Sequence, residues 1–158
     1  MPSFRLPPAQ HERLDAVIRA VRACFGALRE AGDRLHADLG ISSAMRAVME
    51  FVAEQPATVP DIARAKRVSR QNIQVLVDAL LGSGMLVAEP NAAHRRSPLI
   101  ALSRPGKVAY RRIAERERAA LAEIAAAVSA ADLDSTHRTL AMLTERLAAR
   151  AEPVEIES

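Results

Sequence analysis

Aromatic residues are scarce in this 158-residue chain: three phenylalanines, one tyrosine and no tryptophan together account for 3% of it. Hydrophobic residues nevertheless reach 49%, so a core has to be built from alanine, leucine, valine and isoleucine. Alanine and leucine favour helices, whereas strands prefer aromatic and β-branched residues. The composition therefore favours a helical protein over a β-sandwich, organised as one domain or as one compact domain with an extension.

Cysteine and long apolar runs are also nearly absent. The single cysteine, Cys24, excludes an internal disulfide and favours a reducing compartment. No apolar run approaches the roughly 18 residues of a transmembrane helix, and no basic-then-apolar leader opens the sequence. We therefore expect a cytoplasmic protein that does not enter a membrane.

The sequence also lacks the motifs of catalysis and metal binding. It has no phosphate-binding glycine loop, no His-Glu metal pair and no nucleophile elbow. Its histidines show neither i, i+4 pairing nor a neighbouring cysteine, and they are His11, His36, His94 and His137. We expect no catalytic residues, no metal and no cofactor, and hence no enzyme. The net charge of +3 is small but compatible with a polyanionic partner.

The segment from Ser69 to Gly84 has the pattern of a capped amphipathic helix. Ser69 is a good N-cap, and Gly84 can supply the left-handed residue that ends a helix. Apolar residues at i, i+3, i+4 and i+7 form one stripe: Ile73, Leu76, Val77 and Leu80. Upstream, a short helix over Val59–Lys66 and a tight turn at Arg67–Val68 complete a predicted helix-turn-helix.

The opposite face of this helix begins with polar side chains that suit DNA recognition. Forked amides hydrogen-bond purine edges in the major groove, whereas cations contact phosphates. The alternative is a polar solvated face on an ordinary core helix. The predicted base-reading residues are Gln71, Asn72 and Gln74. The other predicted DNA-binding residues are the cations Lys66, Arg67 and Arg70, together with the capping Ser69.

Two short strand-like segments follow, MLVAE at 85–89 and LIALS at 99–103. The polar loop between them, PNAAHRRSP, carries Arg95 and Arg96 side by side. A hairpin with a basic tip directly after a helix-turn-helix is typical of a wing, which reaches a minor groove or phosphates through arginine. For these two arginines we favour groove insertion of one of them over a solvated loop.

Long helical patterns flank this module. One begins near Ala9 and is expected to end at Gly40, a second follows to about Gln55, and two more occupy about 104–127 and 132–149. Their apolar stripes exceed what the small module can cover, which favours a homodimer over a monomer that closes on itself. Two recognition helices on a twofold axis would then match a palindromic site, spaced about 34–36 Å apart.

The predicted fold is therefore mainly α with a small β-hairpin wing: a winged helix-turn-helix with long N- and C-terminal dimerisation helices. Residues 1–8 form an N-terminal arm, 9–40 and 104–150 the helical dimerisation region, 41–103 the DNA-binding region and 151–158 a C-terminal tail.

This order of elements resembles the MarR family of bacterial transcription regulators over roughly residues 10–150. DLGIS at 38–42 looks like the junction between the family's first two helices. The segment ATVPDIARAKRVSRQNIQVLVDALLGSGML looks like its helix-turn-helix, and HRRSPLIALSRPG looks like its wing and following strand. The resemblance implies an intertwined dimer whose winged modules dock on a palindromic operator.

In many members of that family a small ligand, often anionic or aromatic, releases a repressor from DNA. The ligand binds where the dimer helices meet the winged module. In this chain the residues implied are Arg22, Phe25, Met45 and Met49. Core packing is an equal alternative for the last three, and a solvated side chain is the more common alternative for Arg22. We interpret Cys24, beside the apolar stripe, as a buried structural thiol rather than a redox sensor.

Four positions depart from the family pattern. Asn91 replaces the acidic residue that pairs with a wing arginine, and Arg67 replaces the glycine of the turn. Lys66 stands where the residue is often apolar, and Val75 stands where arginine is common. The predicted function is a sequence-specific DNA-binding repressor acting as a homodimer. The alternative is an architectural protein of low sequence specificity, which a small ratio of specific to nonspecific affinity would identify.

Overall fold

The computed structural model describes residues 8–94 and 96–151. Most of the predicted arm, most of the predicted tail and Arg95 of the predicted wing lie outside the described residues. The chain divides into two compact units, residues 1–117 and residues 118–158. We call them the N-terminal unit and the C-terminal unit and describe each by itself.

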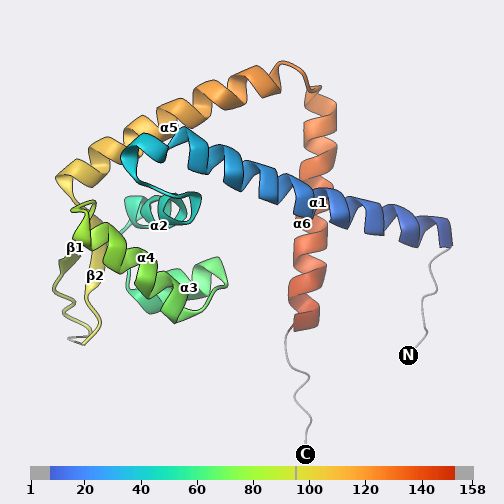
Figure 1. Ribbon diagram of the computed structural model, residues 1–158. Helices are drawn as coiled ribbons and strands as arrows, with labels where there is room; N and C mark the ends of the chain where they lie inside the picture. The colour runs from blue at the N-terminus through green and yellow to red at the C-terminus, as the bar shows by residue number, and fades with distance from the viewer. Residues whose placement is uncertain (1–7, 95, 152–158) are drawn as a thin grey trace, which may run out of the picture. The chain divides into compact units, whose positions relative to one another are not determined.

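The helices and strands follow one another in the predicted order (Figure 1). Their bounds are α1 (Pro8–Leu35), η1 (Ala37–Leu39), α2 (Ser43–Glu54), α3 (Val59–Lys66), α4 (Arg70–Gly82), β1 (Leu86–Glu89), β2 (Leu99–Leu102), α5 (Arg104–Ala125) and α6 (Ala130–Ala151). The strands are antiparallel, with Leu86 opposite Leu102. Ala57 adds a backbone bridge to the other edge of β2 at Ile100, with N···O distances of 3.1 and 2.8 Å. The predicted fold class, mainly helical with a β-hairpin wing, is confirmed.

Local capping chemistry starts the helices of the winged module. The hydroxyl oxygens of Ser42, Thr58 and Ser69 accept hydrogen bonds from backbone N–H groups three residues on, at 3.2, 3.3 and 3.2 Å. Each bond satisfies an N–H group that has no partner within its own helix. These three caps fix where α2, α3 and α4 begin, and Ser69 is the cap that the sequence analysis predicted for α4.

The first helix ends earlier than predicted, at Leu35 rather than at Gly40. The chain then makes a 3-10 turn, which Gly40 ends in the left-handed conformation with φ of 64°. The Leu35 carbonyl accepts a hydrogen bond from Arg116 of α5 at 3.0 Å, in place of the helical N–H that a continued helix would supply. His36, which follows, is fully buried.

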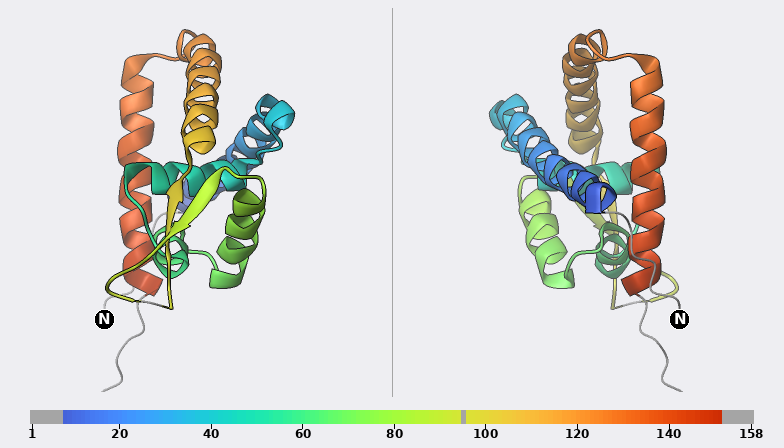
Figure 2. Two further views of the ribbon diagram at one scale, coloured as in Figure 1. Left: turned by 90° about the vertical axis from the view of Figure 1, so that its left-hand side faces the viewer. Right: turned by 90° about the vertical axis from the view of Figure 1, so that its right-hand side faces the viewer.

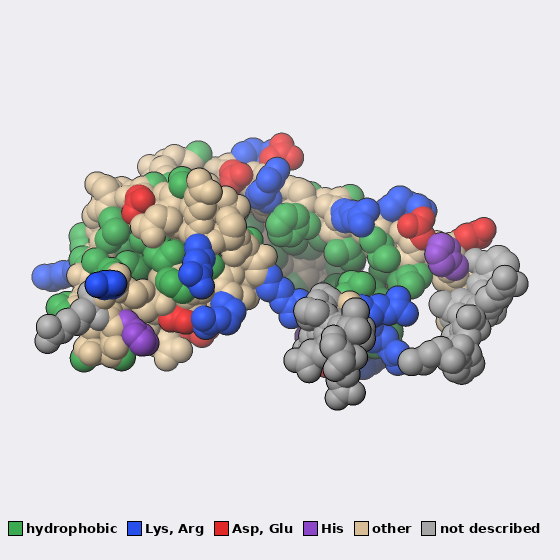
Figure 3. All heavy atoms as spheres, turned by 90° about the horizontal axis from the view of Figure 1, so that it is seen from below, with side chains coloured by type: hydrophobic (Ala, Val, Ile, Leu, Met, Phe, Trp, Pro, Cys, Tyr) green, Lys and Arg blue, Asp and Glu red, His purple; other side chains and the backbone are tan. Residues whose placement is uncertain are grey.

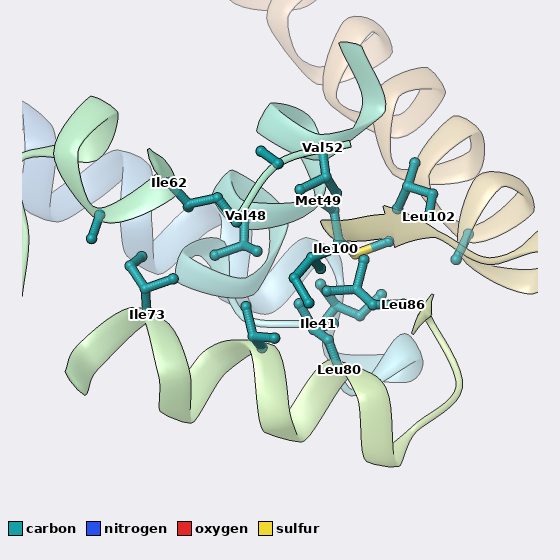
Figure 4. Close-up of a cluster of buried hydrophobic side chains, with 14 of the residues drawn as sticks. Ile41, Val48, Met49, Val52, Ile62, Ile73, Leu80, Leu86, Ile100 and Leu102 are labelled. Atoms are coloured by element: carbon teal, nitrogen blue, oxygen red, sulfur yellow. The ribbon is translucent and has the colours of Figure 1, made fainter. Parts of the chain in front are cut away.

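The core of the N-terminal unit seats the helix-turn-helix. Figure 4 shows Ile73 and Leu80 of α4 pointing toward Val48 and Met49 of α2, and all four are at most 2% exposed. Burial of each such side chain contributes about 1.5–3 kcal/mol. Ile62 of α3 joins the same cluster, together with Leu86, Ile100 and Ile113. The predicted apolar stripe of α4 is thus the face that holds it in place.

The middle of α1 has no such cover within the described residues of the N-terminal unit. Its large apolar side chains Val17, Val21, Phe25 and Leu28 are exposed, Phe25 to 69%. Cys24 is exposed as well, so its prediction as a buried thiol was wrong. The reason is that α1 packs on α2 and η1 near its C-terminal end, where Ser43 binds the Arg29 carbonyl and the Asp33 carboxylate.

The C-terminal unit holds the end of α5 and all of α6. The predicted break between them contains Ser129, which caps α6 through the Asp132 N–H at 3.1 Å, so that the helix starts slightly earlier than expected. Its large exposed apolar side chains are Leu121, Ile124, Val128, Leu133, Met142 and Leu147. Among all the described helices, none combines the length and the apolar character needed to cross a membrane.

Candidate nucleic-acid interface

The turn between α3 and α4 is made by Arg67 in the left-handed conformation, with φ of 54° and ψ of 42°. Its N–H group bonds back to α3, and the Val68 N–H reaches the Ala63 carbonyl at 3.1 Å. Two residues later Ser69 caps α4, so the second helix starts directly after the turn. In Figures 1 and 2 the N-terminal end of α4 and the loop of the hairpin lie on the same side of the N-terminal unit. The unit therefore presents a helix end and a hairpin tip together.

The predicted base-reading side chains all stand free of the core. Gln71, Asn72 and Gln74 are exposed, on the face of α4 away from Ile73. The Gln74 amide donates to the Asp78 carboxylate at 2.8 Å, one turn along the same helix. This bond orients the Gln74 amide, an arrangement that sequence reasoning missed although the i, i+4 spacing was its signal.

The cations around the turn differ in their exposure and in whether a carboxylate pairs with them. Arg67 and Arg70 are exposed, whereas Arg64 is paired with Asp61 at 2.9 Å. The Thr58 hydroxyl, and after it Arg64, holds the pKa of the Asp61 carboxyl below its ordinary value. Lys66 is only 31% exposed and contacts a carboxylate of α2. Figure 3 views this side of the molecule, where basic side chains are dispersed over the surface rather than gathered in one patch.

Asn91 organises the loop of the hairpin. Its Oδ1 accepts from the N–H groups of Ala93 and His94 at 3.0 and 3.3 Å, and its Nδ2 donates to the Ser97 carbonyl at 2.9 Å. The residue that departs from the family's acidic pattern thus ties the two ends of the loop without an ionic group. Arg96 is exposed within this loop, whereas Arg95 lies outside the described residues.

The predicted effector-binding residues are not brought together as one lining in the protomer. Arg22 and Phe25 are exposed on α1, Met45 is half-buried, and Met49 is 0% exposed in the core. For Met49 the core-packing alternative therefore holds.

A separate open groove of about 620 Å³ lies between the end of α2, the hairpin strands and the start of α5. Apolar Val52 and Leu102 line it, with Lys107 and Tyr110 of α5. Burial, and after it the charge of Glu50, raises the pKa of the half-buried Tyr110. Sequence reasoning did not find this groove, because its walls come from segments that only the fold brings together.

A network of four charged side chains and one histidine behind the turn was also missed. It runs from His36 through Glu117, Arg46 and Glu50 to Lys66. Single glutamates on long helices carry no sequence signal that distinguishes them from solvated charges.

Comparison with known proteins shows which family and which solved structures this chain is similar to. A family model described as MarR family matches residues 39–97. The uncharacterized protein Rv2011c of Mycobacterium tuberculosis is 32% identical over 129 residues, which cover 80% of this chain and 90% of that protein. A solved structure of the MarR family transcription regulator SP03579 aligns with a TM-score of 0.82 at 24% identity, over 92% of this chain and 97% of the other.

Two further structures share the fold at lower identity. Reduced AbfR bound to DNA aligns with a TM-score of 0.74 at 17% identity, over 93% of this chain and 100% of the other. Staphylococcus aureus MarR in complex with salicylate and kanamycin aligns with a TM-score of 0.79 at 15% identity, over 90% of this chain and 98% of the other. The winged helix-turn-helix and the matched family model agree on one assignment. The chain belongs to the MarR family of DNA-binding transcription regulators.

Proposed function

We propose that the protein is a sequence-specific repressor that binds a palindromic operator in double-stranded DNA as a homodimer. The observation that carries the proposal is the N-terminal face of α4, where Gln71 and Asn72 are exposed on a helix seated by Ile73 and Leu80. A rigid support matters because a base contact requires an amide held at a fixed distance from the purine edge. Each good bidentate contact contributes about 1–3 kcal/mol of discrimination.

The dimer is supported by apolar surface that each unit leaves uncovered. On α1, Val17, Val21, Phe25 and Leu28 follow one another at helical spacings of four, four and three residues, which places them on one face. The end of α5 carries the exposed Leu121 and Ile124, three residues apart, and the exposed Val128 follows the helix. Exposed contiguous apolar faces of this kind mark interfaces in soluble proteins. Two copies would also double the number of bases read.

The phosphate contacts are assigned to the exposed cations at the turn and in the wing. Arg67 and Arg70 flank the start of α4, and Arg96 stands in the hairpin loop, with Arg95 beside it in sequence. Ser69 positions the first turn of α4 through its cap. Fixed phosphate contacts set the register in which the amides of α4 meet the bases.

An effector that releases the repressor remains part of the proposal. The solved Staphylococcus aureus MarR is in complex with salicylate and kanamycin, and salicylate is both anionic and aromatic. Arg22 and Phe25 of α1 are exposed in the single chain, and Met45 of α2 is half-buried. The spacing of three residues between Arg22 and Phe25 places the cation and the ring on one side of α1.

The deciding experiment is anisotropy binding of the purified protein to DNA from upstream of its own gene, with scrambled competitor at two salt concentrations. We expect competitor-resistant binding, and Gln71→Ala should relax specificity at one position of each half-site. Gln10→Ala, an exposed glutamine of α1, is the matched control and should leave specificity unchanged. Equal weakening of every sequence by Gln71→Ala would contradict base reading.

An architectural role is the second candidate, and one observation favours it. Val75 is 64% exposed on α4 at the position where arginine is common in the family, so this helix offers one polar contact fewer. A regulator should prefer its operator by about 10³-fold or more over other DNA, whereas an architectural protein shows a small ratio and a steep salt dependence. The competitor assay separates the two roles.

A further inference from the structure

Lys66, the last residue of α3, is held by α2. Its Nζ lies 3.6 Å from the Oε2 atom of Glu50 and 5.9 Å from the centre of the Phe51 ring. A carboxylate and an aromatic face both stabilise an ammonium group, so the two contacts together favour a withdrawn lysine. By contrast, within the described part of the chain no carboxylate lies within 4.0 Å of Arg67 or Arg70.

The carboxylate of Glu50 is also paired with a second cation, Arg46. The same Oε2 atom lies 2.9 Å from Nη1 of Arg46, one turn earlier on α2. Arg46 in turn donates two hydrogen bonds to Glu117 of α5, at 3.0 and 2.8 Å. Burial disfavours the charge on Arg46, but the bonds to Glu117 and the nearby Glu50 outweigh it and raise the pKa of this guanidinium. The carboxylate that meets Lys66 is therefore part of a supported ionic chain rather than a lone surface charge.

The end of this ionic network that lies away from Lys66 is buried. Glu117 also contacts Nε2 of His36 at 3.2 Å. His36 is 0% exposed, and among the described residues its Nδ1 atom has no hydrogen-bond partner. His36, which follows α1, is thus linked through α5 and α2 to Lys66 of α3, so that five side chains connect across the N-terminal unit. Such a contiguous network ties the carboxylate of Glu50 to the packing of α5 on α2.

We propose that Glu50 is a positioning residue that holds Lys66 back from DNA phosphates, and so limits the number of cations that the helix-turn-helix offers to DNA. The inference rests on the proposed DNA-binding function and adds a carboxylate that competes with phosphate for one lysine. In the unmodified protein Arg67 and Arg70 carry the phosphate contacts of the turn, while Lys66 stays with Glu50 and Phe51.

The size of the effect follows from the exposure of the pair. The side chains of Lys66 and Glu50 are 31% and 40% exposed, and a pair of that kind is worth about 1 kcal/mol or less. Release of Lys66 should therefore tighten DNA binding by about threefold for each bound subunit, and by about fivefold for each at most. Each newly neutralised phosphate steepens the slope of log affinity against log salt by about 0.9.

The test is a double-mutant cycle of Glu50→Gln and Lys66→Gln in the full chain, with duplex DNA affinity measured over a salt series. We expect Lys66→Gln alone to leave the salt slope unchanged. We expect Glu50→Gln to steepen it by about 0.9 for each bound subunit, and the double variant to return it to the starting value. Glu54→Gln removes the same charge one turn further along α2 and is the matched control, which should change neither slope nor affinity.

Two results would overturn the inference while the protein still binds DNA. A shallower slope for Lys66→Gln alone would mean that Lys66 already contacts a phosphate. Equal tightening by Glu50→Gln with and without Lys66 would mean that Glu50 acts through general repulsion. Glu50→Asp keeps the charge but withdraws it by one methylene, so it should also release Lys66 if Glu50→Gln fails to fold. No DNA binding by the unmodified protein at low salt would instead overturn the proposed function, and this inference with it.

Discussion

Replacement of Arg67 by glycine should stabilise the protein and weaken its hold on DNA. Arg67 is the one non-glycine residue in the described part of the chain with a positive φ, 54°. A side chain with a Cβ atom pays about 1–2 kcal/mol in that conformation. Glycine removes this strain but loses about 0.5–1 kcal/mol more backbone entropy on folding. The net gain is about 0.5–1 kcal/mol, or about 1–4 °C in Tm for a chain of this size.

The affinity for DNA should fall in Arg67→Gly, because Arg67 is an exposed cation beside the first turn of α4. Loss of one phosphate contact makes the slope of log affinity against log salt shallower by about 0.9 for each subunit bound. Thermal unfolding followed by circular dichroism measures the change in Tm. Fluorescence anisotropy with labelled duplex over a salt series measures the salt slope of DNA affinity. Arg67→Lys, which keeps both the charge and the strained backbone, is the control and should change neither.

Either half of the expectation can fail separately. A lower Tm for Arg67→Gly would show that the arginine side chain stabilises the turn by more than its backbone strain costs. An unchanged salt slope would remove Arg67 from the set of phosphate contacts, and with it the reason why a strained arginine stands where the family has glycine.

Three further changes test other parts of the structure. Gly106→Ala places a Cβ atom 1.9 Å from the Met85 carbonyl oxygen, so it should lower the urea midpoint of unfolding by an amount that corresponds to about 1–3 kcal/mol or more. Asn91→Ala removes three hydrogen bonds from the hairpin loop and should weaken DNA binding while Tm changes little, whereas an unaltered affinity would separate the loop from DNA. Arg116→Gln removes the guanidinium that lowers the pKa of Asp38 from 3.8 to about 2. Because the stabilising contribution of that carboxylate is present above its ordinary pKa and is lost as pH falls from 3.8 to about 2, the Tm difference between variant and parent should narrow over that interval.

The parts of the fold that depend on neighbours in sequence were predictable. Ser42, Thr58 and Ser69 start α2, α3 and α4 as caps, and each acts on an N–H group only three residues away. The stripe that includes Ile73 and Leu80 is likewise local, since helical periodicity alone places these residues on one face. The exposure of Gln71 on the other face follows from the same periodicity, although its DNA contact stays a prediction.

The parts that depend on distant residues were not predictable. The end of α1 at Leu35 is set by Arg116, whose place on α5 beside that carbonyl only the folded chain reveals. Cys24 was assigned to the core because it neighbours an apolar stripe. The periodicity of a stripe, however, does not indicate whether the surface that packs against it belongs to the same chain. The DNA contact of Lys66 stays a prediction, but the sequence gives no sign that Glu50 lies 3.6 Å from its ammonium group.

The scarcity of aromatic residues has a spectroscopic consequence. Tyr110 is the only tyrosine and the chain has no tryptophan, so the intrinsic ultraviolet fluorescence of the protein comes from a single side chain together with three weakly emitting phenylalanines. That side chain is half-buried on α5, where burial and the charge of Glu50 both raise its pKa. Its emission therefore reports on the junction of α2 and α5 in the native molecule, without a label and without an engineered tryptophan.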